Sequence, residues 1–253
     1  MRGFRFIIAG IVALFGFISY CSTQSENPVT GEKQYVSLTP EQEITLGRQL
    51  APQMAAQFGG VSTNPLRDRV RQVGERVVAR SSAAKTPYKY SFHLLADRKT
   101  VNAFALPGGQ IFITEALLGL LNTENELAAV LGHEVGHVLA RHSAEHLAKQ
   151  QLTQTLLGAV VIGSGADYNT AQLAQLVGSL VNMKHGRDDE HESDMLGLRL
   201  VAEAGYDPRA MINVMQVLEK ASGGGGQPEF ASTHPSPANR VQRIREQLDK
   251  MQK

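Results

Sequence analysis

The spacing of hydrophobic and polar positions predicts a mostly helical chain with one short β section. Alternation and turn residues predict three strands at 88–95, 101–106 and 110–114, the last two joined as a hairpin over Pro107-Gly108-Gly109. Apolar residues at helical spacing predict helices over 39–58, 66–80, 122–146, 170–183, from 187 onward, and 208–222. Two glycine-rich stretches, 156–167 and 223–226, are expected to be connections. The pattern indicates an α+β fold with a small antiparallel sheet.

The first 38 residues follow a different pattern. Arg2 and Arg5 precede an apolar run of 15 residues, Phe6 to Tyr20. This run is shorter than the about 20 residues that a spanning helix needs, but it has the length of a signal-peptide core. We therefore expect residues 1–20 to be a signal peptide, the polar residues 21–38 to be a tether, and residues 39–253 to form the functional domain.

The single cysteine, Cys21, directly follows the apolar run. This position resembles the acylated first residue of a bacterial lipoprotein, although Tyr20 stands where a small residue is usual. The alternatives are an uncleaved membrane anchor and an ordinary signal with a chance cysteine. We expect Cys21 to be acylated, because exported proteins seldom keep one unpaired cysteine. Ser22 then resembles the sorting signal for the outer membrane, so the predicted location is the periplasm, with a lipid anchor in that membrane.

The composition excludes some classes of function. The chain has 253 residues and is 42% hydrophobic, which is sufficient for a substantial core. Its 25 basic and 24 acidic residues give a formal net charge of +1. A nucleic-acid-binding protein would normally have a basic excess, so no nucleic acid is expected as a partner.

The strongest chemical signal is the stretch His133-Glu134-Val135-Gly136-His137. In a helix, His133 and His137 share one face, so that both imidazoles can bind one ion. Glu134 projects beside that ion, where a glutamate can act as a general base in a zinc protease. Thr123 and Glu126 form a capping box at the start of the helix. The alternative is a buried helix whose two histidines only pack or form hydrogen bonds.

A catalytic zinc ion needs a third protein ligand. Ala140 and Ser143 occupy the positions at which one class of zinc proteases has a glycine and a third histidine, so that class is excluded. His142 and His146, on the same predicted helix, should point away from the His133 face and lie at the surface or behind the ligands. The acidic stretch 187–197 offers Glu190 and Asp194 on one helical face; its alternative is a solvated helix start that the helix dipole favours.

Several separated segments, taken together, resemble one known family. They are His133-Glu134-Val135-Gly136-His137, Glu190 with Asp194 and Gly197, Asn102-Ala103-Phe104-Ala105 with Gly108-Gly109, and Thr233-His234-Pro235 with Arg240. Together they are similar to the CaaX prenyl protease and HtpX family of zinc peptidases, and the layout resembles its soluble periplasmic BepA- and LoiP-like type. The similarity covers about residues 27–245. Ser193 departs from the pattern, because an alanine is usual before the aspartate. We expect no helical-repeat extension after Lys253, and the resemblance is then to the short, LoiP-like type.

This resemblance implies a zincin-like fold in which 39–253 is a zinc metalloprotease domain of the gluzincin type. It implies one Zn²⁺ per chain bound by His133, His137 and Glu190, with Glu134 as the base. The implied supporting residues are Asp194, which orients the ligands, and Arg240, which orients a loop or binds a substrate carbonyl. His234 would either stabilise the oxyanion or occupy the open metal position.

The resemblance also implies a substrate and a role in the cell. An extended substrate would add to the strand at Asn102, Ala103 and Phe104 by backbone hydrogen bonds. The implied role is the turnover of misfolded or misassembled proteins of the cell envelope. The alternative is a zinc-stabilised chaperone or assembly factor for outer-membrane proteins, with latent or gated protease activity.

Overall fold

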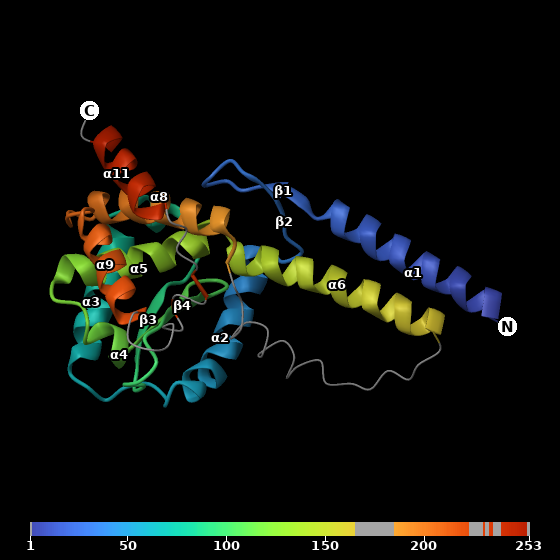
Figure 1. Cartoon of the computed structure of the whole chain (residues 1–253), viewed down its shortest axis with the longest axis horizontal. Coiled ribbons are helices and arrows are strands. Elements are labelled where there is room, and N and C mark those ends of the chain that lie inside the picture. Colours follow the sequence, from blue (N-terminus) through green and yellow to red (C-terminus); the bar gives the residue numbers. More distant parts are fainter. Residues whose placement is uncertain (1, 165–184, 223–229, 231–232, 235–238, 252–253) are drawn as a thin grey trace.

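The computed structural model describes residues 2–164, 185–222, 230, 233–234 and 239–251 (Figure 1). The helices are α1 (Arg2–Ser22), α2 (Pro40–Gln57), α3 (Leu66–Ala79), α4 (Glu115–Leu118), α5 (Glu124–Leu139), α6 (His142–Ser164), α8 (Arg187–Glu203), α9 (Ala210–Ser222) and α11 (Arg240–Met251). The strands are β1 (Gln24–Glu26), β2 (Lys33–Tyr35), β3 (Ser91–Leu95), β4 (Ala103–Leu106) and β5 (Gln110–Thr114). The predicted helix 170–183 and the glycine run 223–226 lie outside the described residues.

The helix starts predicted from the sequence are confirmed. Thr39 caps α2 through a capping box with Gln42, and Pro40 occupies the first helical turn. Thr123 and Glu126 cap α5 in the same way. In each case a side-chain oxygen accepts a hydrogen bond from a backbone N–H that has no partner within the helix.

The three-stranded sheet has the order β3-β5-β4. The β4–β5 hairpin is antiparallel, as predicted, but β3 runs parallel to β5, so the sheet is mixed. The chain leaves β3 and forms β4 one strand position away, and β5 then fills the position between them. Strand β5 is therefore central, parallel to β3 and antiparallel to β4. The predicted α+β class is confirmed, and β4 is left at an edge of the sheet.

Helix α5 is the centre of the fold, packed against β4 and β5, α3, α8 and α9 (Figure 1). Nearly all of its side chains are buried, the two histidines included. Glycines allow α8 to approach it closely. A Cβ on Gly136 would lie 2.8 Å from the Ser193 carbonyl oxygen, and one on Gly197 would lie 3.1 Å from the Cα of His133. This close packing brings the acidic first turns of α8 beside the two histidines.

The predicted helix 122–146 is divided into two. Arg141 adopts a φ of 62°, a left-handed conformation that ends α5 and turns the chain into α6. Its side chain holds this turn by donating to the buried carboxylate of Glu43 and to the carbonyl oxygen of Leu38. Helix α6 then continues to Ser164, so most of the connection expected over 156–167 is helical.

The segment expected to be a tether is folded onto the domain. Strands β1 and β2 form an antiparallel hairpin. Asn27 and Gln34 are buried, and their side-chain amides donate to the carbonyl oxygens of Leu139 and Ala140, where α5 ends. The burial of these polar residues is explained by the carbonyl groups at the end of α5, which need hydrogen-bond donors. Composition alone did not reveal this contact between distant segments.

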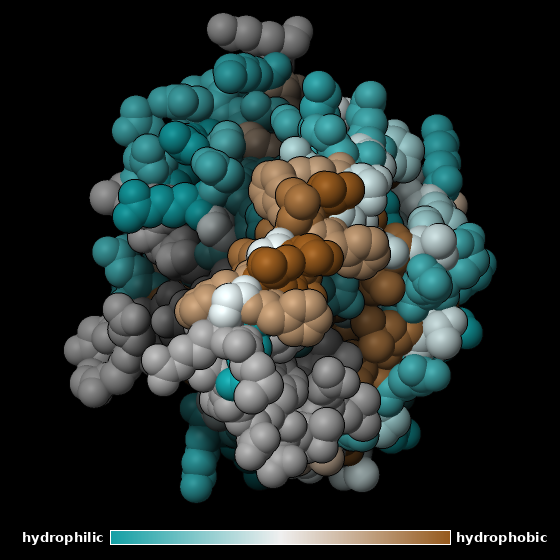
Figure 2. All heavy atoms as spheres, turned by 90° about the vertical axis from the view of Figure 1, so that its right-hand side faces the viewer, coloured by the Kyte–Doolittle hydropathy of each residue, from teal (hydrophilic) through white to brown (hydrophobic). Residues whose placement is uncertain are grey.

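Helix α1 lies beside α6, and the pair extends away from the rest of the molecule (Figure 1). Viewed from that side, the surface has a group of hydrophobic side chains near its centre (Figure 2). The exposed apolar residues of α1 include Phe4, Phe6, Ile7, Ile11, Leu14 and Phe15. By length and composition, Gly3–Ser22 is the one described helix that could cross a membrane, although a signal sequence has the same properties. The apolar run is thus part of a longer helix than its 15 residues predicted.

Candidate metal centre

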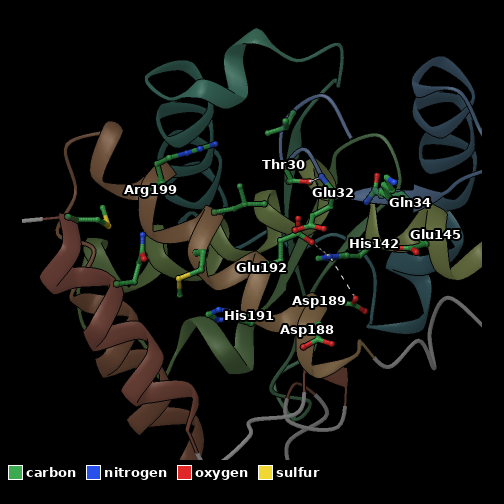
Figure 3. A pocket seen from close by; sticks show the side chains of 16 residues that line it. Thr30, Glu32, Gln34, His142, Glu145, Asp188, Asp189, His191, Glu192 and Arg199 are labelled. Carbon is green, nitrogen blue, oxygen red and sulfur yellow. Dashed lines mark hydrogen bonds and ion pairs between the residues drawn. The ribbon is translucent and has the colours of Figure 1, made fainter. Parts of the chain in front are cut away.

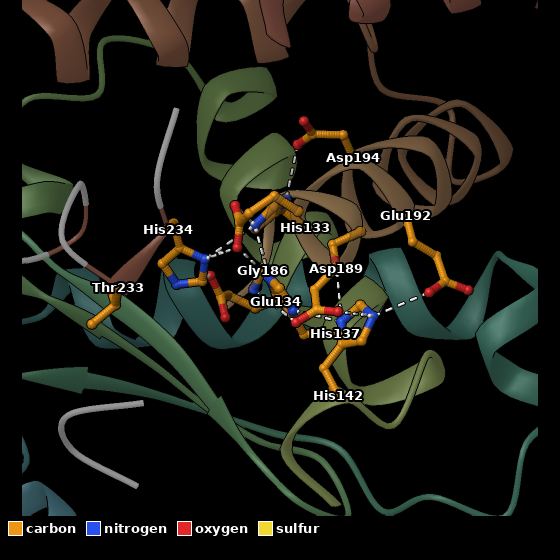
Figure 4. Close-up of polar contacts among 12 residues, drawn as sticks. His133, Glu134, His137, His142, Gly186, Asp189, Glu192, Asp194, Thr233 and His234 are labelled. Atoms are coloured by element: carbon orange, nitrogen blue, oxygen red, sulfur yellow. Dashed lines mark hydrogen bonds and ion pairs between the residues drawn. The ribbon is translucent and has the colours of Figure 1, made fainter. Parts of the chain in front are cut away.

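Two elements far apart in the sequence bring the predicted ligands together (Figure 4). The Nε2 atoms of His133 and His137, one turn apart on α5, are 3.0 Å from each other. Glu190 reaches them from the first turn of α8: its Oε1 is 3.4 Å from His137 Nε2, and its Oε2 is 3.5 Å from His133 Nε2. All three side chains are almost completely buried.

These residues fit a bound divalent cation. Two imidazole nitrogens and a carboxylate oxygen are the donor set of a three-ligand catalytic zinc site. The cluster is buried, yet among the described residues both carboxylate oxygens of Glu134 lack a hydrogen-bond partner. Buried polar atoms are costly without a partner. A cation among them would supply the compensating charge.

The side chain of Glu134 points toward the same cluster, but Glu134 is not one of the three candidate ligands. Its side chain is fully buried, and its Oε1 lies 3.8 Å from Nε2 of His234. Burial raises the pKa of Glu134, and the neighbouring His234 and His133 only partly oppose this effect. A carboxylate whose proton affinity is increased in this way is suited to accept a proton during a reaction.

His234 comes close to the other groups from the C-terminal part of the chain. Its Nδ1 is 2.9 Å from Glu190 Oε1 and 3.4 Å from His133 Nε2. Backbone hydrogen bonds hold this segment in place: His185 N donates to the Thr233 carbonyl, and Phe230 N donates to the Val101 carbonyl. His234 is thus close enough to join His133, His137 and Glu190 as a fourth ligand, since one donor atom from each lies within 4.8 Å of the others.

Asp194 and Arg240 lie behind the ligands. Asp194 Oδ1 is 3.0 Å from Nδ1 of His133. Arg240 donates to both oxygens of Asp194, at 2.6 and 2.8 Å, and its Nη1 is 2.9 Å from Glu190 Oε2. The guanidinium therefore pairs with buried carboxylates and not with a position open to substrate.

These charges determine the protonation of the ligands. Burial raises the pKa of Glu190, but the neighbouring His234 and the bonds from His133 and His137 outweigh it, so that the pKa lies well below its usual value. Burial lowers the pKa of His133, but the carboxylates of Asp194 and Glu190 raise it to about 9. For His137, burial and the nearby His185 hold the pKa well below the usual value. Glu190 is accordingly anionic and His137 neutral, the forms that bind a metal, whereas His133 would have to lose a proton to bind one.

Two further histidines lie near the ligands. His142 is buried and contacts His137, so of its two predicted places it takes the one behind the ligands. The break at Arg141 removes it from the helical phase of α5, in which it would have pointed away. His185 was not predicted, yet its ring stacks on that of His137 at 4.0 Å. The only signal for it was its place five residues before Glu190. Among the described residues, His137, His142 and His185, and separately His146, His185 and Asp189, also form groups with metal-ligand spacing.

The predicted substrate strand lies beside this centre. A small pocket of about 30 Å³ is lined by Asn102 and Phe104 together with Ser143, His185 and His234. Asn102 is buried, and its Oδ1 has no hydrogen-bond partner among the residues that the structure describes. Ala103 is fully buried and does not line the pocket. The edge strand β4 thus runs along the pocket that leads to His234.

A helix that carries two convergent histidines and a buried glutamate, with a distal glutamate beside them, serves metallopeptidase chemistry. Comparison with known proteins agrees. Residues 65–248 match the model of peptidase family M48. The chain is 31% identical to the beta-barrel assembly-enhancing protease of Yersinia pestis over 88% of its own length and 47% of that protein. It is 30% identical to the mitochondrial metalloendopeptidase OMA1 of Schizosaccharomyces pombe, over 99% of its own length and 74% of that protein.

The chain therefore belongs to peptidase family M48, and the predicted class, a zinc metalloendopeptidase, is confirmed. The beta-barrel assembly-enhancing protease of Escherichia coli strain K12 is 28% identical over 88% of this chain. The chain spans 47% of the length of both bacterial proteins, about half.

Proposed function

We propose that this protein is a zinc-dependent endopeptidase of the bacterial cell envelope that hydrolyses misfolded or misassembled proteins. The observation that carries the proposal is the buried Glu134, whose two carboxylate oxygens have no hydrogen-bond partner in the described part of the chain, while His133, His137, Glu190 and His234 converge beside it. A helix that only packed its histidines would have no use for an unpaired buried carboxylate at this place.

His133, His137 and Glu190 would hold one Zn²⁺ per chain. When bound, the ion supplies Lewis acidity toward a water molecule and the peptide carbonyl. Glu134 accepts a proton from the attacking water, whose oxygen forms the new bond to the carbonyl carbon. As the C–N bond breaks, Glu134 gives that proton to the departing amine nitrogen. Asp194 keeps His133 oriented, and Arg240 keeps Asp194 and Glu190 in place.

We assign substrate positioning to the edge strand β4 and the residue before it, at Asn102, Ala103 and Phe104. An unfolded segment can add to an edge strand through backbone hydrogen bonds that do not depend on its side chains. The pocket that joins Asn102 and Phe104 to His234 supports this direction of approach. This binding mode suits unfolded substrates, because they offer extended backbone.

The proposed location is the periplasm, with residues 1–20 as the signal peptide and Cys21 as the site of a lipid anchor in the outer membrane. Cys21 is exposed at the end of α1, which is compatible with processing there. Similarity to the bacterial beta-barrel assembly-enhancing proteases supports an envelope role. The partners would then be unfolded or misassembled envelope proteins and the membrane.

The decisive experiment compares cleavage of an unfolded protein by the wild type and by Glu134→Gln, each with its metal content measured. We expect zinc-dependent cleavage by the wild type, and no cleavage by the variant with its zinc retained, because Glu134 is not a ligand. Equal cleavage by both would refute the role of Glu134.

A second candidate is a zinc-stabilised chaperone or assembly factor with gated protease activity. The proximity of His234 Nδ1 to Glu190 Oε1, 2.9 Å, favours it, because His234 in the ligand set would fill the position that a water needs. His234→Ala separates the two. Increased cleavage would indicate a gate, whereas decreased cleavage would indicate that His234 stabilises the oxyanion.

A further inference from the structure

Behind His137, a line of polar contacts leads away from the metal centre (Figure 4). Nδ1 of His137 is 2.8 Å from Nδ1 of His142. On the other side of the second ring, Nε2 of His142 is 3.1 Å from Oε2 of Glu192. His137 and His142 are each about 2% exposed, so water does not compete for the contact between them.

The position of each proton in this line follows from the metal centre. If His137 binds the ion through Nε2, its one remaining proton must be on Nδ1, because a neutral imidazole carries a single N–H. Nδ1 of His142 must then accept that hydrogen bond. The proton of His142 is therefore on Nε2, from which it donates to the Glu192 carboxylate.

Ser193 contacts the same ring. Its hydroxyl oxygen is 3.3 Å from Nδ1 of His142, and its side chain is fully buried. A hydroxyl can donate or accept, so this contact helps to hold the ring in place with either tautomer of His142. In the family that the sequence resembles, an alanine is usual at this position, and an alanine could not make this bond.

The far end of the line reaches a separate groove. Glu192 and His142 line a pocket of about 780 Å³ on the side of the β1–β2 hairpin, together with Glu32, Gln34, Asp189 and His191 (Figure 3). The Glu192 side chain is 26% exposed at this groove, whereas the imidazole that its Oε2 contacts is buried.

We propose that His142 is a positioning residue of the metal centre, which Glu192 and Ser193 hold so that it fixes the orientation and tautomer of His137. This inference rests on the proposed function, in which His137 binds the ion through Nε2. His142 and Glu192 do for His137 what Asp194 and Arg240 do for His133, so each histidine ligand is supported from a different direction. Metal-binding histidines generally need such a partner on their second nitrogen.

The first test measures tautomers, by ¹⁵N nuclear magnetic resonance of the histidine side chains in the full, zinc-loaded chain in detergent. We expect the proton of His142 on Nε2 and that of His137 on Nδ1. A proton on Nδ1 of His142, in protein that contains zinc, would overturn the proposal. A protein that binds no zinc and cleaves nothing would instead refute the proposed function, so the two failures are distinguishable.

The second test measures zinc affinity by competition with a chelator. His142→Ala should weaken binding about 10–100-fold, the usual effect of losing such a partner. His142→Gln should restore most of the affinity, since its amide oxygen can accept from His137 Nδ1–H. The control is His191→Ala: His191 lies on α8 and lines the same groove, but it belongs to none of the groups with metal-ligand spacing among the described residues. Equal loss in His142→Ala and His191→Ala, or no rescue by glutamine, would contradict the positioning role.

Discussion

Arg141 and Glu43 form an ion pair at the point where α5 gives way to α6. Nε of Arg141 donates to Oε1 of Glu43 at 2.8 Å, and the Glu43 side chain is 1% exposed. The same arginine has the left-handed φ of 62° that starts α6 in a new direction. This pair therefore connects the second helix of the fold to the turn that places His142 behind the metal centre.

Removing the arginine should destabilise the protein strongly. Arg141→Ala leaves the Glu43 charge buried without a partner, and we expect the free energy of unfolding to fall by about 3–5 kcal/mol. Urea unfolding measures it. The control is Arg71→Ala, which breaks exposed pairs with Asp68 and Glu75 and should cost less than about 1 kcal/mol. Similar losses for both variants would contradict this view of the turn.

Close packing of α5 on α8 should be sensitive to one methyl group. In Gly136→Ala the new Cβ would meet the Ser193 carbonyl oxygen at 2.8 Å, a backbone atom that cannot move alone. We expect a loss of about 1–3 kcal/mol, with weaker zinc binding because Glu190 would move with α8. Gly158→Ala in α6, with nothing within 4 Å of its added Cβ, should be neutral or slightly stabilising. Thermal unfolding and chelator competition would show whether the two glycines differ in this way.

Loss of the Asp194 charge should weaken metal binding without unfolding the protein. In Asp194→Asn, the Arg240 guanidinium keeps Glu190 as a partner at 2.9 Å, while His133 loses its anionic neighbour. We expect zinc affinity to fall about 10–100-fold. Asp188→Asn, which changes an exposed acid in the first turn of the same helix, serves as the control. An unchanged affinity in Asp194→Asn would mean that Asp194 does not support His133.

Tyr88 should make the protein less stable in alkali. Burial, followed by the nearby Glu43 charge, raises the pKa of Tyr88 above its usual value of 10.0. The unfolded chain then loses this proton first, so stability falls as the pH rises through the usual tyrosine pKa and toward the raised one. In this window each such group contributes a slope of about 1.4 kcal/mol per pH unit.

Tyr88→Phe should remove that part of the slope. The measurement is the free energy of unfolding from urea titrations between about pH 9 and 11, with tyrosinate absorbance followed in parallel. Burial also raises the pKa of Tyr90, so a shallower slope should remain in the variant. Identical slopes for the variant and the wild type would show that Tyr88 ionises equally in both states.

Much of the site could be predicted from local sequence. The capping box at Thr123 and Glu126 defined the start of α5, and a four-residue spacing put His133 and His137 on one face of it. These features depend on helix geometry alone, which any short segment carries with it. The distal Glu190 was different, because an acidic residue at a helix start is common without any metal. Glu190 became a candidate ligand only because the two histidines were already identified and because the family resemblance pointed to it.

The errors arose where distant segments meet. The sequence predicted one helix over 122–146, but the chain turns at Arg141. This left-handed turn is stabilised by Glu43, which is almost a hundred residues away, so the local sequence did not indicate it. The polar residues Asn27 and Gln34 were assigned to a tether, but they donate to carbonyls at the end of α5. Local periodicity contains no information on such partners.

By itself, the sequence determined the start of α5, the placement of the two candidate histidine ligands and the candidate general base on that helix, and the family. Only the tertiary structure decided that β3 runs parallel to β5, that Arg240 pairs with Asp194 and Glu190, and that His142 and His185 lie against His137. The physical reason is that helix and strand periodicity are set by neighbours in the chain. Ligand support and strand order are instead set by which buried charges and backbone groups find partners when the elements pack.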